Sequence, residues 1–280
     1  MPAKHTVETK ARTLISGLAM GESPRWHEDR LWLSDWGAQE ILVIDLDGKS
    51  EVVVRVPFAL PFCIDWLFDG HLLVVSGREG LLMRREHDGS LVAHADLRDL
   101  SSEGWNEIVV DGRGNVYING GAGIALVATD GSVRQVADSF AFPNGMAITP
   151  DNSTLIIAES HGKKLTAFDI ALNGSLSNRR VWADLGSGVP DGICIDVDGA
   201  VWYADVPNKR CVRVREGGDV LQTVNVALGC FACMLGGPDR RTLFIVATEW
   251  HGMEKIAEVA QARTGQVLTI EAPAPGIGWP

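Results

Sequence analysis

The chain has 280 residues, enough for one large domain or two small ones. Hydrophobic residues make up 46% and charged residues 22%, a balance typical of a globular protein that excludes a disordered chain. The net charge of −11 and the lack of any run rich in Lys and Arg exclude electrostatic binding of nucleic acid.

The apolar runs, such as residues 242–248, fall far short of the roughly 20 residues that span a bilayer, so we expect no membrane partner. Residues 1–9 are polar and lack the apolar stretch of a signal peptide. Five cysteines, an odd number, do not indicate a disulfide framework. We therefore expect a cytoplasmic protein.

A pattern of about forty residues recurs along the chain, and repeats of this length indicate solenoids or propellers. Each unit has an apolar stretch, a turn containing Asp, Gly or Pro, and a second apolar strand. The fourth unit (FPNGMAI) and the fifth (VPDGICI) match nearly residue for residue, 47 positions apart. In chain order, the units begin at residues 21–26, 61–66, 104–110, 142–148, 189–195 and 230–235.

Six units that each read as four short strands predict an all-β fold, a six-bladed β-propeller with four-stranded blades. Glycine, at 31 residues, is abundant enough for the many tight turns of such a fold. We expect one domain over residues 1–280, with a short C-terminal tail from about 271. Residues 6–16 are free to add a strand to the last blade and close the ring, and the one helix-like stretch is 252–262.

In a propeller, the first strand of each blade lines the central channel, so residues at the same phase in different blades converge. Four of the six equivalent positions carry oxygen-bearing side chains, which suit a hard divalent cation. The alternative is that they only contact channel water. In chain order, the six positions are Glu22, Phe62, Asn106, Asn144, Asp191 and Ala232.

The loops after the second strand of each blade face the same mouth. They contain His161 and His251, two candidate proton carriers, although a solvated loop histidine is the simpler interpretation. In chain order, these rim positions are Asp35-Trp36, Ser76–Arg78, Asn119, Ser160-His161, Asp205–Asn208 and Glu249–His251.

These motifs resemble the SMP-30/gluconolactonase/luciferin-regenerating-enzyme family, six-bladed propellers with a channel metal, many of which hydrolyse lactones. The resemblance runs from about Leu18 to Trp250. Each motif is short, but four in the right order and phase are specific. They are GESPRW at 21–26, WNE at 105–107, FPNG at 142–145 and PDG at 190–192.

The resemblance implies that Glu22, Asn144 and Asp191 bind one divalent cation and that Asn106 contacts the substrate. Calcium is the first choice because all the ligands are oxygens, and Zn²⁺, Mn²⁺, Mg²⁺ and Fe²⁺ are the alternatives. Asp191, or a water molecule that it orients, is the candidate general base.

One departure concerns the substrate. Sugar lactonases of the family often carry an Arg two residues before the Asn, where this chain has Gly104. Aromatic residues near the mouth suggest a less polar lactone or ester, and we predict that Asn106, Trp105, Phe62 and His161 contact it. The aromatic residues at the predicted rim are Trp36, Phe62, Trp105, Phe231 and Trp250.

The leading prediction is therefore a metal-dependent lactonase-like carboxylic ester hydrolase with a small-molecule substrate. The alternatives are a phosphotriesterase-like hydrolase, which needs the same cation, and a propeller scaffold without catalytic activity. The pair Cys230 and Cys233 lacks a second CxxC or a pair of histidines. We expect these two cysteines on opposite faces of a strand, as small buried side chains.

Overall fold

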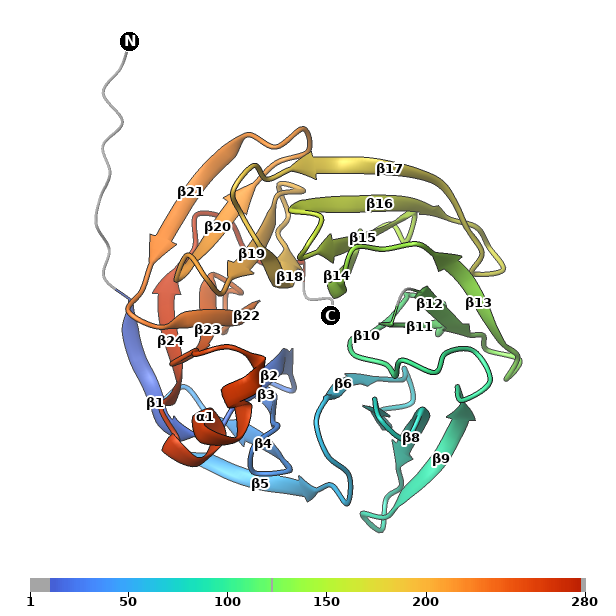
Figure 1. Ribbon diagram of the computed structural model, residues 1–280, viewed down its shortest axis with the longest axis horizontal. Helices are drawn as coiled ribbons and strands as arrows, with labels where there is room; N and C mark the ends of the chain where they lie inside the picture. The colour runs from blue at the N-terminus through green and yellow to red at the C-terminus, as the bar shows by residue number, and fades with distance from the viewer. Residues whose placement is uncertain (1–10, 122, 278–280) are drawn as a thin grey trace.

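Six antiparallel sheets of four strands each surround a central axis (Figure 1). This computed structural model describes residues 11–121 and 123–277. It confirms the predicted six-bladed propeller with four-stranded blades. Five blades consist of four consecutive strands, and the sixth combines strands from both ends of the chain.

Blade 1 consists of β2 (Gly21–His27), β3 (Arg30–Asp35), β4 (Glu40–Ile44) and β5 (Ser50–Arg55). Blade 2 consists of β6 (Phe62–Trp66), β7 (Leu72–Ser76), β8 (Leu81–Arg85) and β9 (Leu91–Asp96). Blade 3 consists of β10 (Ile108–Val110), β11 (Val116–Gly120), β12 (Gly123–Val127) and β13 (Val133–Asp138).

Blade 4 consists of β14 (Pro143–Ile148), β15 (Thr154–Glu159), β16 (Lys164–Ile170) and β17 (Leu176–Asp184). Blade 5 consists of β18 (Pro190–Ile195), β19 (Val201–Asp205), β20 (Arg210–Val214) and β21 (Val220–Asn225). Blade 6 consists of β22 (Gly229–Gly236), β23 (Thr242–Thr248), β24 (Gly265–Glu271) and β1 (Arg12–Leu18).

Blade 6 closes the ring. β1 is its outermost strand and pairs antiparallel with β24, from Arg12 opposite Thr269 to Leu18 opposite Gly265. The predicted closing strand is thereby confirmed from residue 11 onward, and residues 6–10 lie outside the described part of the chain.

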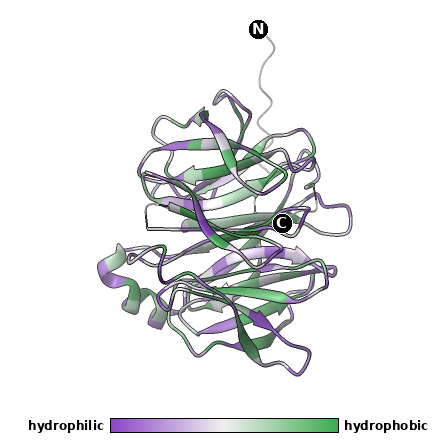
Figure 2. Cartoon of the chain, turned by 90° about the vertical axis from the view of Figure 1, so that its right-hand side faces the viewer, coloured by the Kyte–Doolittle hydropathy of each residue, from purple (hydrophilic) through white to green (hydrophobic). Residues whose placement is uncertain are grey.

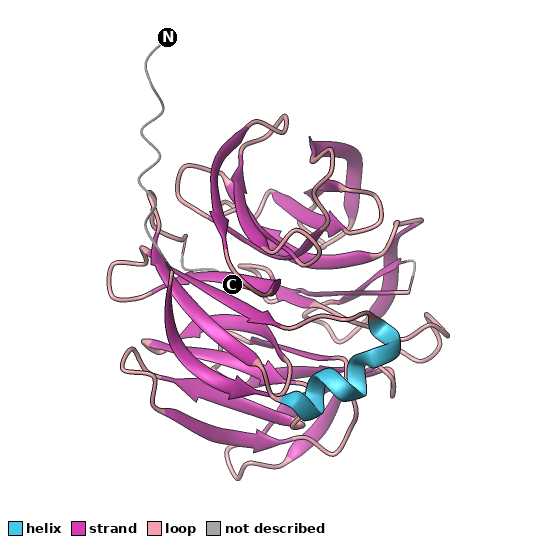
Figure 3. Cartoon of the chain, turned by 60° about the vertical axis from the view of Figure 1, so that its left-hand side comes forward, coloured by secondary structure: helices cyan, strands magenta, loops and turns pink. Residues whose placement is uncertain are grey.

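The connection between β23 and β24 carries the helical segment that the sequence predicts, a 3₁₀ turn η1 (Met253–Lys255) followed by α1 (Ile256–Ala262) (Figure 3). A Cβ built on Gly37 would come within 2.7 Å of the Ala260 side chain, so α1 lies tightly on the β3–β4 loop of blade 1. No helix in the described residues is long and apolar enough to cross a membrane.

Apolar side chains fill the spaces between neighbouring blades. Hydrophobic stretches run along the strands of the blades in view in Figure 2. Large aromatic side chains such as Tyr117, Trp202 and Tyr203 are fully or almost fully buried. Burial on both faces explains why the inner strands are nearly continuous apolar runs.

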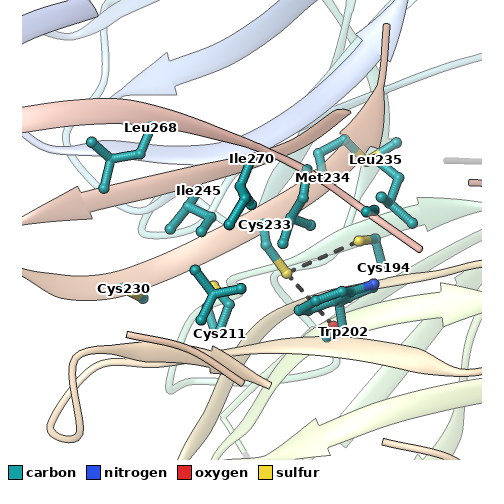
Figure 4. Close-up of a cluster of buried hydrophobic side chains, with 14 of the residues drawn as sticks. Cys194, Trp202, Cys211, Cys230, Cys233, Met234, Leu235, Ile245, Leu268 and Ile270 are labelled. Carbon is teal, nitrogen blue, oxygen red and sulfur yellow. Dashed lines mark hydrogen bonds between the residues drawn. The ribbon is translucent and has the colours of Figure 1, made fainter. Parts of the chain in front are cut away.

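Four cysteines lie in the core between blades 5 and 6 (Figure 4): Cys194, Cys211, Cys230 and Cys233. The Sγ atoms of Cys194 and Cys233 are 4.0 Å apart. The expectation that Cys230 and Cys233 point to opposite faces is wrong, because the β22 register shifts between Cys230 and Ala232. That bulge reverses the alternation, so both thiols enter the same cluster.

All five cysteines are free and buried, and buried thiols react slowly because reagents cannot reach them. We predict that fewer than about one thiol per chain reacts with an aromatic disulfide reagent within minutes in native buffer, and that all five react in denaturant. A Leu172→Cys variant is the positive control because Leu172 is 86% exposed. Rapid labelling of the wild-type protein would contradict the buried cluster.

Candidate functional site

β-Bulges mark the start of the inner strands at one end of the propeller. The register shifts between Glu22 and Arg25 in β2, between Pro143 and Met146 in β14, and between Pro190 and Ile193 in β18. A bulge re-aims the side chains beside it. Three of the predicted ligand positions, Glu22, Asn144 and Asp191, lie at or next to these bulges.

The bulges bring neighbouring inner strands unusually close, which explains the small residue that follows each predicted ligand. A Cβ built on Gly145 would lie 2.5 Å from the Asp191 carbonyl oxygen, and one on Gly192 would lie 2.6 Å from the Ala232 Cβ. Ser23 takes the equivalent place in blade 1, with a φ of 49°, and its Oγ accepts a hydrogen bond from the Ile64 amide at 3.0 Å.

Side-chain hydrogen bonds link blades 3, 4 and 5 at this end. Asn106 Nδ2 donates to Asn144 Oδ1 at 3.3 Å. Asn144 Nδ2 lies 3.4 Å from Ser160 Oγ, which itself donates to the Pro190 carbonyl at 2.6 Å. The structure therefore brings Asn106 and Asn144 together, beside the turn that carries Asp191.

Asn106 precedes β10 and has no strand partner of its own. Asn119 holds it instead: the Asn106 amide donates to the Asn119 carbonyl at 2.6 Å, and the Asn119 side chain donates to the Asn144 carbonyl. The sequence places Asn119 and Ser160 only on the rim, and their role as supports for the two amides emerges from the structure.

Three carboxyl groups meet near the axis. Glu22 is only 6% exposed, and its carboxylate accepts a hydrogen bond from its neighbour, the Ser23 amide. Burial raises the pKa of Glu22 to about 8, and repulsion from Glu107 contributes. Burial also raises the pKa of Asp191 well above its usual range, with repulsion from Glu22 and Glu107 adding to the effect and a hydrogen bond from Asn144 opposing it.

Glu107 is a functional candidate that the sequence reasoning passed over, although it directly follows Asn106. Its carboxylate lies 3.1 Å from Nη2 of Arg25, and both side chains are buried. Arg25 also donates to the Ile108 carbonyl at 2.8 Å, which anchors the start of β10 to β2. The sequence feature that could have indicated this pair is Arg25 itself, a charged residue of the GESPRW motif in an inner strand, where it needs a buried acidic partner.

The donor set fits a hard divalent cation. Glu22 is buried and Asp191 is partly buried, and two carboxylates that repel each other need a counter-charge. The side-chain amides of Asn144 and Asn106 lie beside Asp191. Across the described residues, no three His, Cys, Asp or Glu side chains form a metal-binding group. The set proposed here has two carboxylates completed by amides, which suits Ca²⁺ rather than a metal preferring nitrogen or sulfur.

Two predicted substrate contacts are buried instead. Phe62 is fully buried and packs edge-on against Phe58, with ring centroids 5.9 Å apart. Trp105 is 2% exposed and lies in the core between blades 2 and 3. β6 keeps a regular register from Phe62 onward, so no bulge turns that side chain toward the axis. Neither ring is placed to touch a ligand.

The remaining rim residues are more accessible. His161 is exposed, and its ring lies 4.7 Å from that of Phe142. Phe231 is buried against Trp250, whereas Trp250 and Trp36 are partly exposed. The aromatic rim is therefore smaller than the sequence suggests.

Surface cavities lie elsewhere on the molecule. Volumes of about 280, 210 and 240 Å³ occur beside Arg134, Trp66 and Trp182 respectively. None of these three is lined by the converging Glu, Asn and Asp side chains. The candidate site therefore rests on the convergence of polar groups from several blades.

The model of the SMP-30/Gluconolactonase/LRE-like region matches residues 20–249. The chain belongs to this family. Among similar proteins, a diisopropyl-fluorophosphatase of Loligo vulgaris is 29% identical to this chain over 199 residues, 60% of this chain and 63% of that protein. Pentonolactonase XacC of Haloferax volcanii is 26% identical over 261 residues, 87% of each chain.

The fold also matches a solved structure. A crystal structure of regucalcin from Agrobacterium tumefaciens, described as a calcium-binding protein, superposes with a TM-score of 0.79. The match covers 96% of each chain at 22% identity. At that identity the likeness establishes a shared fold.

The raised pKa of Glu22 predicts a pH-dependent stability in the metal-free protein. Between about pH 4.5 and pH 8, folded Glu22 keeps a proton that the unfolded chain releases, so stability falls as pH rises across this window. At pH 8 we expect the free energy of unfolding of Glu22→Gln to exceed that of the wild type by on the order of a few kcal/mol. The urea midpoint of the variant should be higher accordingly. The difference should shrink toward pH 5.

The measurement is urea unfolding in the presence of a chelator at several pH values. Glu51→Gln is the matched control because Glu51 is exposed on the outermost strand of blade 1. A Glu22→Gln difference that does not change with pH would show that Glu22 does not carry this proton.

Proposed function

We propose that this protein is a divalent-metal-dependent hydrolase of a lactone or a related ester. The observation that carries the proposal is the convergence of oxygen-bearing side chains from separate blades at one end of the inner strands. Asn144 is hydrogen-bonded to Asn106 and to Asp191, and repulsion from Glu22 raises the pKa of Asp191. Glu22, Asn144 and Asp191 would hold the cation, with Ca²⁺ as the first choice.

The relatives support this assignment. Pentonolactonase XacC matches over most of both chains, which favours a lactone as the substrate class. The calcium-binding regucalcin shares the fold, which agrees with the oxygen-rich donor set. Five free cysteines favour a reducing compartment, and we place the protein in the cytoplasm.

A bound divalent cation supplies Lewis acidity that polarises a carbonyl and stabilises developing negative charge. Side chains of the protein would orient the substrate and transfer the proton. Asn106 Nδ2 can donate a hydrogen bond to the carbonyl or ring oxygen of the substrate. Asp191 accepts a proton from the attacking water, and Asn144 orients its carboxylate. As the acyl C–O bond breaks, the proton passes from Asp191 to the departing ring oxygen, which yields the hydroxy acid and restores the carboxylate.

A phosphotriester hydrolase is the second candidate, favoured by the similarity to diisopropyl-fluorophosphatase. The same cation and the same Asn106 donor suit a P=O oxygen as well as a C=O oxygen. A scaffold without catalytic activity is disfavoured, because binding alone does not require buried carboxylates that repel each other.

The substrate is proposed to be less polar than an aldonolactone. Gly104 stands where related sugar lactonases carry an Arg, and it cannot contact sugar hydroxyls through a side chain. Among the rim aromatics, only Trp36 and Trp250 remain partly exposed, so the missing Arg is the stronger argument.

A panel of substrates tests the proposal. We expect acid release from alkyl or aromatic lactones with a higher kcat/KM than from glucono-lactone, and loss of activity in chelator that added Ca²⁺ reverses. A phosphotriester in the same panel tests the second candidate function, phosphotriester hydrolysis. Elemental analysis should find about one divalent ion per chain. No hydrolysis of any lactone or ester in metal-loaded protein would refute the proposal.

We predict that Asp191 acts as the general base in addition to binding the cation. We expect Asp191→Asn, which keeps the size and one ligand oxygen, to lower kcat by at least about 10²-fold at saturating Ca²⁺, the scale of lost general-base assistance. Cation occupancy is checked separately by calorimetry. Asp47→Asn, on an exposed turn of blade 1, is the control. Near-normal turnover at full cation occupancy would show that Asp191 is not the general base. His161 and His251 would then be the next candidates for that role.

A further inference from the structure

We propose that Arg25 sets the net charge of the central cation site at −2 by neutralising Glu107, and thereby reduces the electrostatic advantage that trivalent ions have over divalent ions at this site. This inference rests on the proposed function, because it takes the site of Glu22, Asn144 and Asp191 as a cation site. It adds a determinant of ion selectivity that touches neither the cation nor the substrate.

Arg25 is held where its charge acts on Glu107. Nη2 lies 3.1 Å from Glu107 Oε1 and donates to the Ile108 carbonyl at 2.8 Å, while Nη1 donates to the Pro24 carbonyl at 3.0 Å. Arg25 and Glu107 are 7% and 5% exposed, so water screens their charges little. Glu107 also accepts a hydrogen bond from the Ile108 amide at 2.9 Å, which keeps it turned toward Arg25.

Glu107 lies beside the candidate cation site, because it directly follows Asn106, whose side chain donates to Asn144 at 3.3 Å, and because its partner Arg25 shares β2 with Glu22. Its charge contributes to the raised pKa of Glu22 and to that of Asp191, and Arg25 partly offsets the effect at Glu22. Without Arg25, three carboxylates would face one another at the axis. With it, their sum is −2, which matches one divalent cation.

One further carboxylate faces Arg25. Asp65 on β6 accepts hydrogen bonds from the Val110 amide and the Trp66 amide, both at 2.8 Å. Arg25 lowers its pKa, although burial holds the value at about 6. Because replacing Arg25 would raise the pKa of Asp65, the affinities of all variants are compared over a series of pH values above 7.

The charge argument makes opposite predictions for the two partners. Arg25→Gln leaves −3 and should tighten Ca²⁺ binding, at least about tenfold for a buried unit charge. Glu107→Gln leaves −1 and should weaken binding by a similar factor. The double variant returns the sum to −2 and should bind as wild type does.

Comparing a divalent with a trivalent ion distinguishes an electrostatic role of Arg25 from a structural one. Electrostatic energy is proportional to the charge of the ion. The logarithm of each fold-change should therefore be about 1.5 times larger for Tb³⁺ than for Ca²⁺: tenfold for calcium becomes about thirtyfold for terbium. A residue that only supports the fold would change both ions alike and in the same direction for both single variants.

The experiment measures Ca²⁺ affinity by calorimetry and Tb³⁺ affinity by luminescence, for wild type, the two single variants and the double variant. Arg25→Lys is the charge-conserving control and should stay within about threefold of wild type. Circular dichroism checks folding. Should Arg25→Gln not fold, Glu107→Gln and the double variant still decide the matter, since the double variant removes both charges of the Arg25–Glu107 pair and Asp65 keeps its hydrogen bonds from the Val110 and Trp66 amides.

Opposite shifts in the single variants, restored in the double variant and larger for Tb³⁺, support the role of Arg25. Equal affinities in all variants, or a double variant that binds as weakly as Glu107→Gln, overturn it while leaving the proposed function intact. A wild-type protein that binds neither ion overturns the cation site and this inference together.

Discussion

The close approach of neighbouring inner strands is the constraint on which the candidate site depends. Gly145 and Gly192 leave no room for a Cβ against the next blade, and the Ser23 Oγ accepts a hydrogen bond from the Ile64 amide of the next blade. Because the strands come this close, the side chains one residue earlier in each motif, which are the predicted cation ligands, lie near one another. A larger residue at either glycine would push apart the groups that must meet.

The sequence predicts the ring and the converging residues because both follow from a period of about forty residues. It fails where local backbone geometry breaks the period. Phe62 shares the phase of Glu22, yet β6 has no bulge and its ring stays between blades. In β22 a bulge is present, and it turns Cys230 and Cys233 to one side. Bulges carry no strong sequence signal beyond a small residue, so these positions require the structure.

Buried charge shapes the same region. Removing a carboxylate from water costs free energy unless a partner compensates it, and Glu107 has such a partner in Arg25, 3.1 Å away. Glu22 and Asp191 remain uncompensated by side chains of that kind in the described chain, which explains their raised pKa values. Neither the ion pair nor the imbalance could be read from the repeat, since Arg25 and Glu107 are 82 residues apart.

The pairing of β1 with β24 has a consequence for biosynthesis. A ribosome releases the N-terminal strand first and its partner last, so blade 6 stays incomplete until nearly the whole chain has emerged. Until then nothing fixes blade 1 beside blade 6 in a closed circle. Glu22, in blade 1, and Asp191, in blade 5, therefore reach their final separation only after β24 has been synthesised.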